Sequence, residues 1–143
     1  MMHMRGTPGT MQDATVYEDV VGEVMHFLGM RLAVARKAGI APVWVDPGIG
    51  FGKTTEQNLA LLRGLPRLAA LGAPIYVGAS RKRFIGDVTG VAQPVARLGG
   101  SLGAAAAAAV GGASVIRVHD VAETRRMLDV YLACAGRTGE TLT

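Results

Sequence analysis

The chain alternates between two hydrophobic periods. From Val16 to Ala38, apolar residues recur every three or four positions, which predicts an amphipathic helix that stops at Gly39. The apolar residues 43–45 follow almost directly and predict a short strand that ends at Asp46. A helix is therefore followed by a buried strand, with only a brief connection between them.

The same alternation continues to the end of the chain. It predicts a helix over about 55–71, a strand at 75–79, a helix over about 95–110, a strand at 115–118, a helix over 121–135 and a frayed tail at 136–143. Ser80 is placed to cap a further short helix that begins near Arg81. Short apolar strands that are each followed by a helix predict an α/β fold with a parallel sheet and right-handed crossovers.

The first residues have the character of a further unit of this kind. Residues 2–6 have the pattern of a strand end that enters a loop, yet no strand body precedes them. Four β/α units are thus present, whereas a (β/α)8 TIM barrel takes about 250 residues. We expect residues 1–143 to be one partial barrel domain, the C-terminal half, with the N-terminal half absent. A small flavodoxin-like domain with an ordinary N-terminus is the alternative.

Charge and composition narrow the class of partner. The chain carries 15 Lys and Arg residues against 11 Asp and Glu, but the basic residues form no long stripe and aromatic residues are only 5%. We therefore expect a compact anionic ligand rather than nucleic acid. The sequence shows neither an apolar run of membrane-spanning length nor a signal-peptide pattern, so a cytoplasmic protein with no membrane partner is expected. The single cysteine, Cys134, is expected to be buried in the last helix.

A glycine-rich loop, D-P-G-I-G-F-G-K-T at 46–54, lies between a predicted strand and a predicted helix. Backbone N–H groups in such a loop can hold an anion beside a helix N-terminus. Residues 52–54 match the end of a phosphate-binding P-loop, although Pro47 stands where that motif has its first glycine. A P-loop nucleotide-binding domain therefore stays open as an alternative. Asp46 can accept hydrogen bonds from paired donors of a heterocycle or can cap the turn at Pro47.

Two later strand ends also carry charged residues. Residues 78–83, G-A-S-R-K-R, combine a glycine that lets a flat ligand approach the backbone with three adjacent cations, which we expect to face the ligand. Arg117 and His119 lie on one face of the last strand because side chains alternate, and together they make a phosphate clamp. His3, His26 and His119 show no metal-ligand spacing, so no zinc site is expected.

Four motifs occur in a fixed order along the chain. They are Met2-His3-Met4-Arg5-Gly6-Thr7-Pro8, Asp46-Pro47-Gly48-Ile49-Gly50-Phe51-Gly52-Lys53, Gly78-x-Ser80-Arg81-Lys82 and Arg117-Val118-His119-Asp120. Together they resemble the second half of the dihydropteroate synthase family, across nearly the whole chain. The resemblance implies a (β/α)8 barrel of folate biosynthesis, homodimeric at full length and a target of sulfonamides. Such enzymes join 4-aminobenzoate to 6-hydroxymethyl-7,8-dihydropterin diphosphate, with Mg²⁺ assisting, and release diphosphate.

The resemblance also implies where the pterin binds. Asp46 would hydrogen-bond the pterin ring in a slot lined by Met2, Phe51 and Gly78. Lys82 would contact both the pterin and the neighbouring 4-aminobenzoate pocket. The pterin site would therefore draw on three separate strand ends of the chain.

The other substrate groups are assigned in the same way. Ser80 and Arg83 would shape the 4-aminobenzoate pocket, and Arg117 and His119 would hold the diphosphate. With Lys82, these last two are the expected catalytic residues, because the reaction needs orientation and a stabilised leaving-group charge. No metal ligand is expected in this chain, since the family's residue for Mg²⁺ belongs to its first half.

Two departures from the family pattern keep the function open. Arg83 stands where some relatives have a serine near the 4-aminobenzoate carboxylate. The family's first half, which supplies an Asn for magnesium and two mobile loops, has no counterpart in the sequence. An active synthase, an inactive barrel fragment that keeps half a pterin and phosphate pocket, and a small P-loop-like nucleotide binder therefore remain the competing classes.

Overall fold

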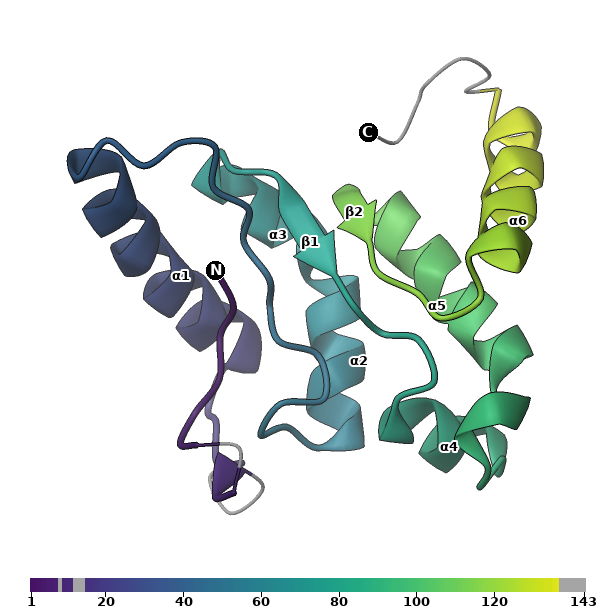
Figure 1. Ribbon diagram of the computed structural model, residues 1–143. Helices are drawn as coiled ribbons and strands as arrows, with labels where there is room; N and C mark the ends of the chain where they lie inside the picture. Colours follow the sequence, from purple (N-terminus) through teal and green to yellow (C-terminus); the bar gives the residue numbers. More distant parts are fainter. Residues whose placement is uncertain (8, 12–14, 137–143) are drawn as a thin grey trace.

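A computed structural model describes residues 1–7, 9–11 and 15–136 of the chain (Figure 1). Its elements are, in order, α1 (Val20–Lys37), α2 (Thr55–Arg63), α3 (Leu65–Leu68), η2 (Ala69–Leu71), β1 (Ile75–Val77), α4 (Arg83–Thr89), η3 (Pro94–Ala96), α5 (Leu98–Val110), β2 (Ala113–Ile116) and α6 (Val121–Cys134). The alternation of helices and short strands agrees with the prediction. The tail expected at 136–143 lies outside the described residues, apart from Gly136.

The strands run parallel, as predicted. β1 and β2 pair in parallel. Val45 forms a single parallel bridge to Ile75 at the start of β1, and Asp46 forms another to Met2. The segments therefore lie side by side in the order in which the chain presents them, and the α/β class with parallel strands is confirmed.

The strands are shorter or placed differently than predicted. Within 43–46 only Val45 and Asp46 pair, each through an isolated bridge rather than in a strand, and β2 runs from Ala113 to Ile116 instead of over 115–118. The small residue Ala113 already lies opposite Ile75, so β2 begins two residues before the branched apolar residues that marked it in the sequence. The last hydrogen bond of the pairing runs from the Arg117 N–H to the Val77 carbonyl, at 2.8 Å.

Helix α1 begins at Val20 rather than at Val16 because Asp19 caps it. The Asp19 carboxylate accepts a hydrogen bond from the Gly22 N–H at 3.0 Å, which satisfies one of the free N–H groups of the first turn. At the other end Gly39 takes a φ of +73°, in agreement with the predicted stop. The buried face of α1 consists of Val20, Val21, Val24, Leu28, Leu32 and Ala35.

The helix predicted over 55–71 is divided into three consecutive pieces, α2, α3 and η2. Thr54 and Gln57 form a reciprocal capping box that starts α2. Gly64 ends α2, and a Cβ there would lie 2.8 Å from Val21 Cγ1, so glycine lets α1 approach this junction. Pro66 lies in the first turn of α3, where its missing N–H costs nothing. Gly72, with a φ of +62°, then ends η2 as predicted.

Two expectations about the later helices are wrong. Lys82, not Ser80, holds the cap position of α4, which begins at Arg83, and the Ser80 hydroxyl is used elsewhere. Cys134 is exposed rather than buried, because α6 buries only Thr124 and Leu128 and its last turn lies beyond that contact. Sequence periodicity marks a helix but does not show how far a packing partner extends along it.

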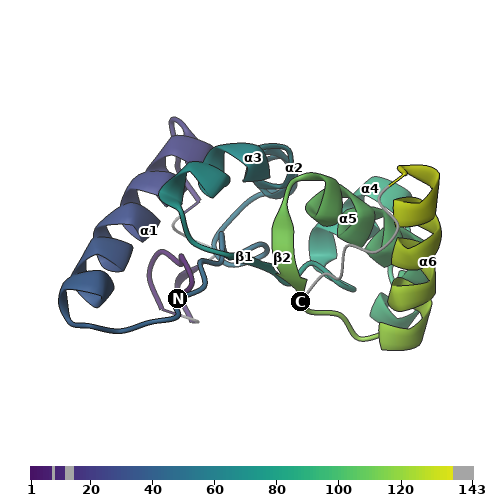
Figure 2. The ribbon, with the colours of Figure 1, turned by 90° about the horizontal axis from the view of Figure 1, so that it is seen from above.

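The helices lie in an arc on one side of the parallel segments (Figure 2). The core between them is built from α1, α2, α3, the strands and the alanine-rich face of α5, which consists of Ala104, Ala105, Ala108 and Ala109. Strands inside and helices outside, each joined by a short loop, form part of a (β/α)8 barrel. None of the described helices is long and apolar enough to cross a membrane.

Two edges of the sheet have no strand beside them within the described ranges, namely the outer edge of β2 and the segment around Met2. Trp44 is also 49% exposed beside that segment. Unpaired edges and exposed apolar side chains favour association. We expect the isolated chain at micromolar concentration to sediment as dimers or larger species. A stable monomer that unfolds cooperatively would contradict this prediction.

Candidate functional site

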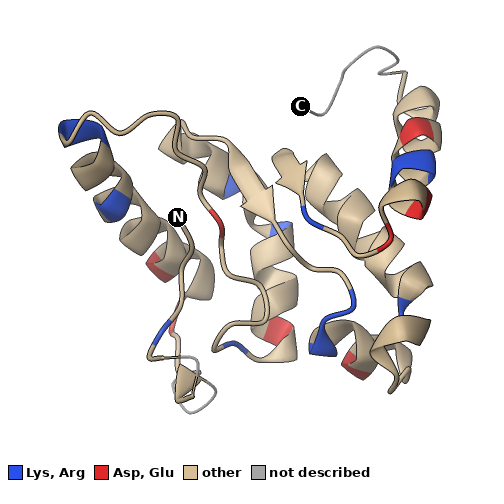
Figure 3. Cartoon of the chain, viewed as in Figure 1, with Lys and Arg blue, Asp and Glu red and all other residues tan. Residues whose placement is uncertain are grey.

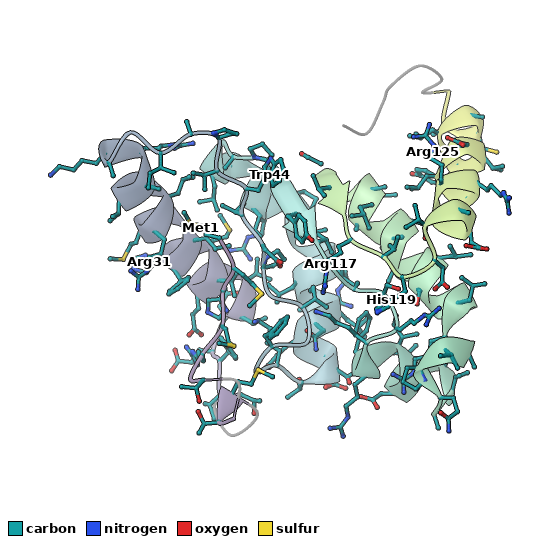
Figure 4. All side chains as sticks on the ribbon, viewed as in Figure 1. Met1, Arg31, Trp44, Arg117, His119 and Arg125 are labelled. Atoms are coloured by element: carbon teal, nitrogen blue, oxygen red, sulfur yellow. The ribbon has the colours of Figure 1, made fainter. Side chains whose placement is uncertain are left out.

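The charged residues of the connecting segments gather at one end of the parallel strands. Figure 3 shows charged residues of both signs on these segments, between the strands and the helices. Figure 4 shows Arg117 and His119 on the segment that joins β2 to α6. Because parallel strands end at a common edge, Asp46, the loop after β1 and this segment come together there.

The loop after Asp46 folds tightly against the N-terminal segment. One Asp46 carboxylate oxygen, Oδ1, accepts a hydrogen bond from the Gly48 N–H at 2.7 Å, so the turn-capping interpretation of this aspartate is confirmed. Gly48 has a φ of +71°, and a Cβ there would lie 1.9 Å from the His3 carbonyl oxygen. Only glycine allows both this conformation and this close approach. The second oxygen of Asp46 accepts no hydrogen bond from the part of the chain that the structure describes.

Lys53 is buried inside this loop rather than aimed at a ligand. Its side chain is 5% exposed, and Nζ donates to the carbonyl oxygens of Gly48 at 3.0 Å and Phe51 at 2.9 Å. Nζ also lies 3.2 Å from His3 Nδ1. A P-loop lysine must reach the phosphates of a nucleotide. Because the loop's own carbonyl groups use the Lys53 ammonium, the geometry speaks against the P-loop alternative.

Lys82 joins the loop after β1 to the loop after Asp46. Its ammonium donates to the Ile49 carbonyl oxygen and lies 4.5 Å from the centre of the Phe51 ring, a cation–π contact. A Cβ on Gly50 would lie 2.9 Å from Lys82 Cδ, so this glycine leaves room for the lysine stem. Asp46 lies close enough to Lys82 for their charges to interact, so the structure brings together Asp46, Phe51 and Lys82.

The buried charges of this site shift one another's titration. Burial lowers the pKa of Lys53 and of Lys82 to about 8 in each case, while the Asp46 carboxylate acts in the opposite direction. Burial raises the pKa of Asp46, against the Gly48 hydrogen bond and the positive charge of Lys82. One carboxylate thus has two incompletely solvated ammonium groups near it, an arrangement that favours an anionic or polar ligand.

Arg117 and His119 form the other part of the site. The Arg117 guanidinium lies over Gly78, where a Cβ would be 3.1 Å from its Nε atom. The Ser80 hydroxyl oxygen lies 3.1 Å from His119 Nδ1 and accepts from the His119 N–H at 3.3 Å. Both Arg117 and His119 are exposed, so their free nitrogen atoms can reach a bound anion.

The three adjacent cations at 81–83 do not act together, contrary to expectation. The chain turns at Arg81, whose side chain pairs with Asp120 instead of facing the loop after Asp46. The Arg83 side chain is 90% exposed on α4, and its Nε lies 3.9 Å from Asp87. Only Lys82 reaches the Asp46 loop. Arg83 instead lines a hollow of about 470 Å³ that Phe51 and Lys82 also line.

The described residues do not fit a magnesium site by themselves. Among them, no three His, Cys, Asp or Glu side chains lie close enough together to hold a metal ion.

Met2, which the resemblance assigns to the pterin slot, lies beside Asp46 through their parallel bridge and is 37% exposed. The sequence interpretation missed the contacts of Lys53 and His3, which nothing in the hydrophobic pattern marks.

Parallel β/α units with charged residues gathered at the strand ends are the arrangement of a β/α-barrel protein. The family described as "Pterin binding enzyme" matches residues 1–119, and the chain belongs to this family. Residues 2, 46, 82 and 117, which lie in the four sequence motifs, all fall within the matched range.

Named relatives agree with this assignment. The dihydropteroate synthase of Synechocystis sp. is 47% identical over 123 residues, which are 85% of this chain and 43% of that protein. The solved Thermus thermophilus dihydropteroate synthase, in complex with 4-aminobenzoate, is 47% identical with a TM-score of 0.91, covering 94% of this chain and 56% of that one. The Yersinia pestis enzyme, in a sulfonamide drug complex, is 38% identical with a TM-score of 0.89, covering 94% and 50%. The chain spans about half the length of the curated relatives it matches.

The buried imidazole of His3 makes a testable contribution to stability. Burial, followed by the charges of Lys53 and Arg5, lowers the pKa of His3 from 6.5 to about 4. Between these values the unfolded chain binds a proton that the folded chain does not, so stability is lost as the pH falls from 6.5 to 4. The difference corresponds to about 3 kcal/mol. Urea unfolding should show this loss in the chain and a smaller loss in His3→Gln.

The matched control is His26→Gln, which removes an exposed histidine from α1. This variant should retain the acid sensitivity of the unsubstituted chain. Equal acid sensitivity in the His3→Gln variant would show that burial of His3 contributes nothing to it.

Proposed function

We propose that this chain supplies the C-terminal half of a dihydropteroate synthase active site, with residues 1–143 as one partial barrel domain. The observation that carries the proposal is the meeting of Asp46, Lys82 and Arg117 at one end of the parallel strands. A Thermus thermophilus relative has been solved with 4-aminobenzoate and also with 6HMPPP. These complexes support the same two classes of ligand for this chain.

The pterin ring is proposed to lie against Asp46. The Gly48 N–H uses only one carboxylate oxygen of Asp46. The other oxygen can accept hydrogen bonds from the paired N–H donors of the pterin ring. Gly78, whose missing side chain lets Arg117 lie over the backbone, is proposed to line the slot with Phe51 and Met2. Lys82, held over the Phe51 ring, can then meet the far side of the pterin.

Arg117 and His119 are proposed to hold the diphosphate. The C–O bond to the diphosphate breaks with both electrons moving to oxygen, which leaves a cationic methylene on the pterin. The arylamine nitrogen of 4-aminobenzoate then attacks that carbon and loses a proton. The charge that grows on the departing oxygen needs fixed donors, which the Arg117 guanidinium and the His119 imidazole supply.

Lys82, Ser80 and Arg83 are proposed to bound the 4-aminobenzoate pocket. Arg83 and Lys82 line the same hollow, and both can attract the carboxylate of that substrate. The Ser80 hydroxyl accepts a hydrogen bond from the His119 backbone N–H, and it can donate a hydrogen bond to His119 Nδ1. His119 would then present an Nε2–H donor to the diphosphate.

The remaining parts of the proposal concern the whole enzyme. We expect turnover to require a second half-barrel such as the relatives have, and this chain alone to be inactive. Mg²⁺ is expected to come with residues of that other half, and none of the steps above runs through it. We further expect the complete enzyme to be a cytoplasmic homodimer.

The test uses a chimera in which this chain follows the N-terminal half of the Thermus thermophilus relative. Arg117→Ala should lower kcat on the order of a hundredfold, equivalent to about 3 kcal/mol, because a donor to the leaving group is lost. Asp46→Asn should chiefly weaken pterin binding, since the amide offers one acceptor to two donors. Release of diphosphate and formation of 7,8-dihydropteroate measure both effects.

Arg125→Ala is the control, because Arg125 lies on α6 away from the site and pairs with Asp129 (Figure 4). Its kcat should match that of the unsubstituted chimera. Lys53→Ala should lower stability more than kcat. A chimera that lost activity with Lys53→Ala and kept it with Arg117→Ala would refute the proposal.

A further inference from the structure

Arg81 has an unusual backbone conformation at the centre of the loop after β1. Its φ is +58°, and among the described residues the other positive φ values belong to glycines. A side chain in this region is strained, so the conformation persists only where surrounding contacts impose it. Such strain is concentrated at functional sites, where neighbouring groups hold the strained residue in place.

The side chain of Arg81 is held by Asp120. Its Nε and Nη2 atoms lie 3.1 Å and 2.5 Å from the two carboxylate oxygens, which is a bidentate pair. The two side chains are 26% and 19% exposed, and the hydrogen bonds from Arg81 hold the pKa of Asp120 below its usual range. The pair is therefore better ordered than a surface ion pair of long, mobile side chains.

The backbone of Arg81 is held from a different element. Its N–H donates to the buried Ser101 hydroxyl of α5 at 2.9 Å, and its carbonyl oxygen accepts from Arg97 Nη1 at 3.0 Å. Ser101 in turn donates to the Arg97 carbonyl oxygen at 2.7 Å. The start of α5 thus fixes both peptide groups of Arg81, and Asp120 fixes its side chain.

This arrangement lies between residues proposed to meet the ligand. Arg81 follows Ser80, which contacts His119, and Asp120 directly follows His119. The two contacts are therefore adjacent cross-links between the same two loops. On the other side, Arg81 precedes Lys82, whose ammonium reaches the Asp46 loop. Rotation of Arg81 would move Ser80 and Lys82 together.

We propose that the Arg81–Asp120 pair is a positioning device that aims the His119 imidazole at the diphosphate and the Lys82 ammonium at the pterin of one ligand. The inference rests on the proposed function, because it takes the pterin diphosphate as that ligand. Neither Arg81 nor Asp120 touches the ligand. The pair acts by keeping the loops after β1 and β2 in a fixed relation.

The experiment measures two properties of the chain, namely its affinity for inorganic pyrophosphate by calorimetry and the ¹⁵N shifts of the His119 ring nitrogens. Asp120→Asn, which leaves one acceptor for two donors, should weaken pyrophosphate binding on the order of tenfold. The His119 ring shifts should move towards a mixture of tautomers as the Ser80 contact loosens. The exchanged pair Arg81→Asp with Asp120→Arg should recover both properties, since aspartate tolerates a positive φ.

Asp129→Asn is the matched control, because it disrupts an exposed pair with Arg125 on α6, at 2.8 Å, and should change neither property. Unchanged affinity and ring shifts in Asp120→Asn would overturn the proposal. Full recovery of both properties when Arg81→Gly is added to Asp120→Asn would also overturn it, because glycine relieves the backbone strain without restoring the ion pair. If the unsubstituted chain failed to bind pyrophosphate, the proposed function would fail, and the His119 ring shifts would still decide whether the pair positions that residue.

Discussion

Parallel pairing of consecutive strand segments is the constraint on which the candidate site depends. The Tyr76 N–H donates to the Val45 carbonyl at 2.8 Å, and the Arg117 N–H donates to the Val77 carbonyl at 2.8 Å, so each segment sets the height of the next. Long helical connections separate these segments in sequence. All of them end at one edge, so three loops meet there. This pairing brings together charged residues that lie far apart in the sequence.

Gathering these charges costs solvation free energy, and the loops are built to offset it. The Lys53 ammonium is satisfied by two carbonyl groups of its own loop, and the Asp46 carboxylate by a backbone N–H. Glycines permit the close approaches, as at Gly48 against His3 and Gly78 under Arg117. The groups proposed to contact the ligand are thereby fixed before it arrives, which is the condition for electrostatic stabilisation of a growing charge.

The sequence was sufficient to predict the parallel α/β order and the segments after the strands in which Asp46, Lys82, Arg117 and His119 lie, although the strand bounds differ from those predicted. Those features follow from hydrophobic periods and local motifs, which are properties of neighbouring residues. The failures concern contacts between distant residues. Ser80 was expected to cap a helix but meets a histidine 39 positions away, and the burial of Lys53 runs against its polarity. Cys134 was misplaced because periodicity does not show where a packing partner ends.

The most direct test compares two ligands, a pterin with the diphosphate and the same pterin without it, by equilibrium binding to the chain. If one site holds the pterin at Asp46 and the diphosphate at Arg117, substitutions at these two residues must affect the two ligands differently. Asp46→Asn should weaken both ligands to the same extent, whereas Arg117→Ala should weaken only the ligand that carries the diphosphate. Equal losses for both ligands in Arg117→Ala, or no loss in Asp46→Asn, would contradict the arrangement of the site.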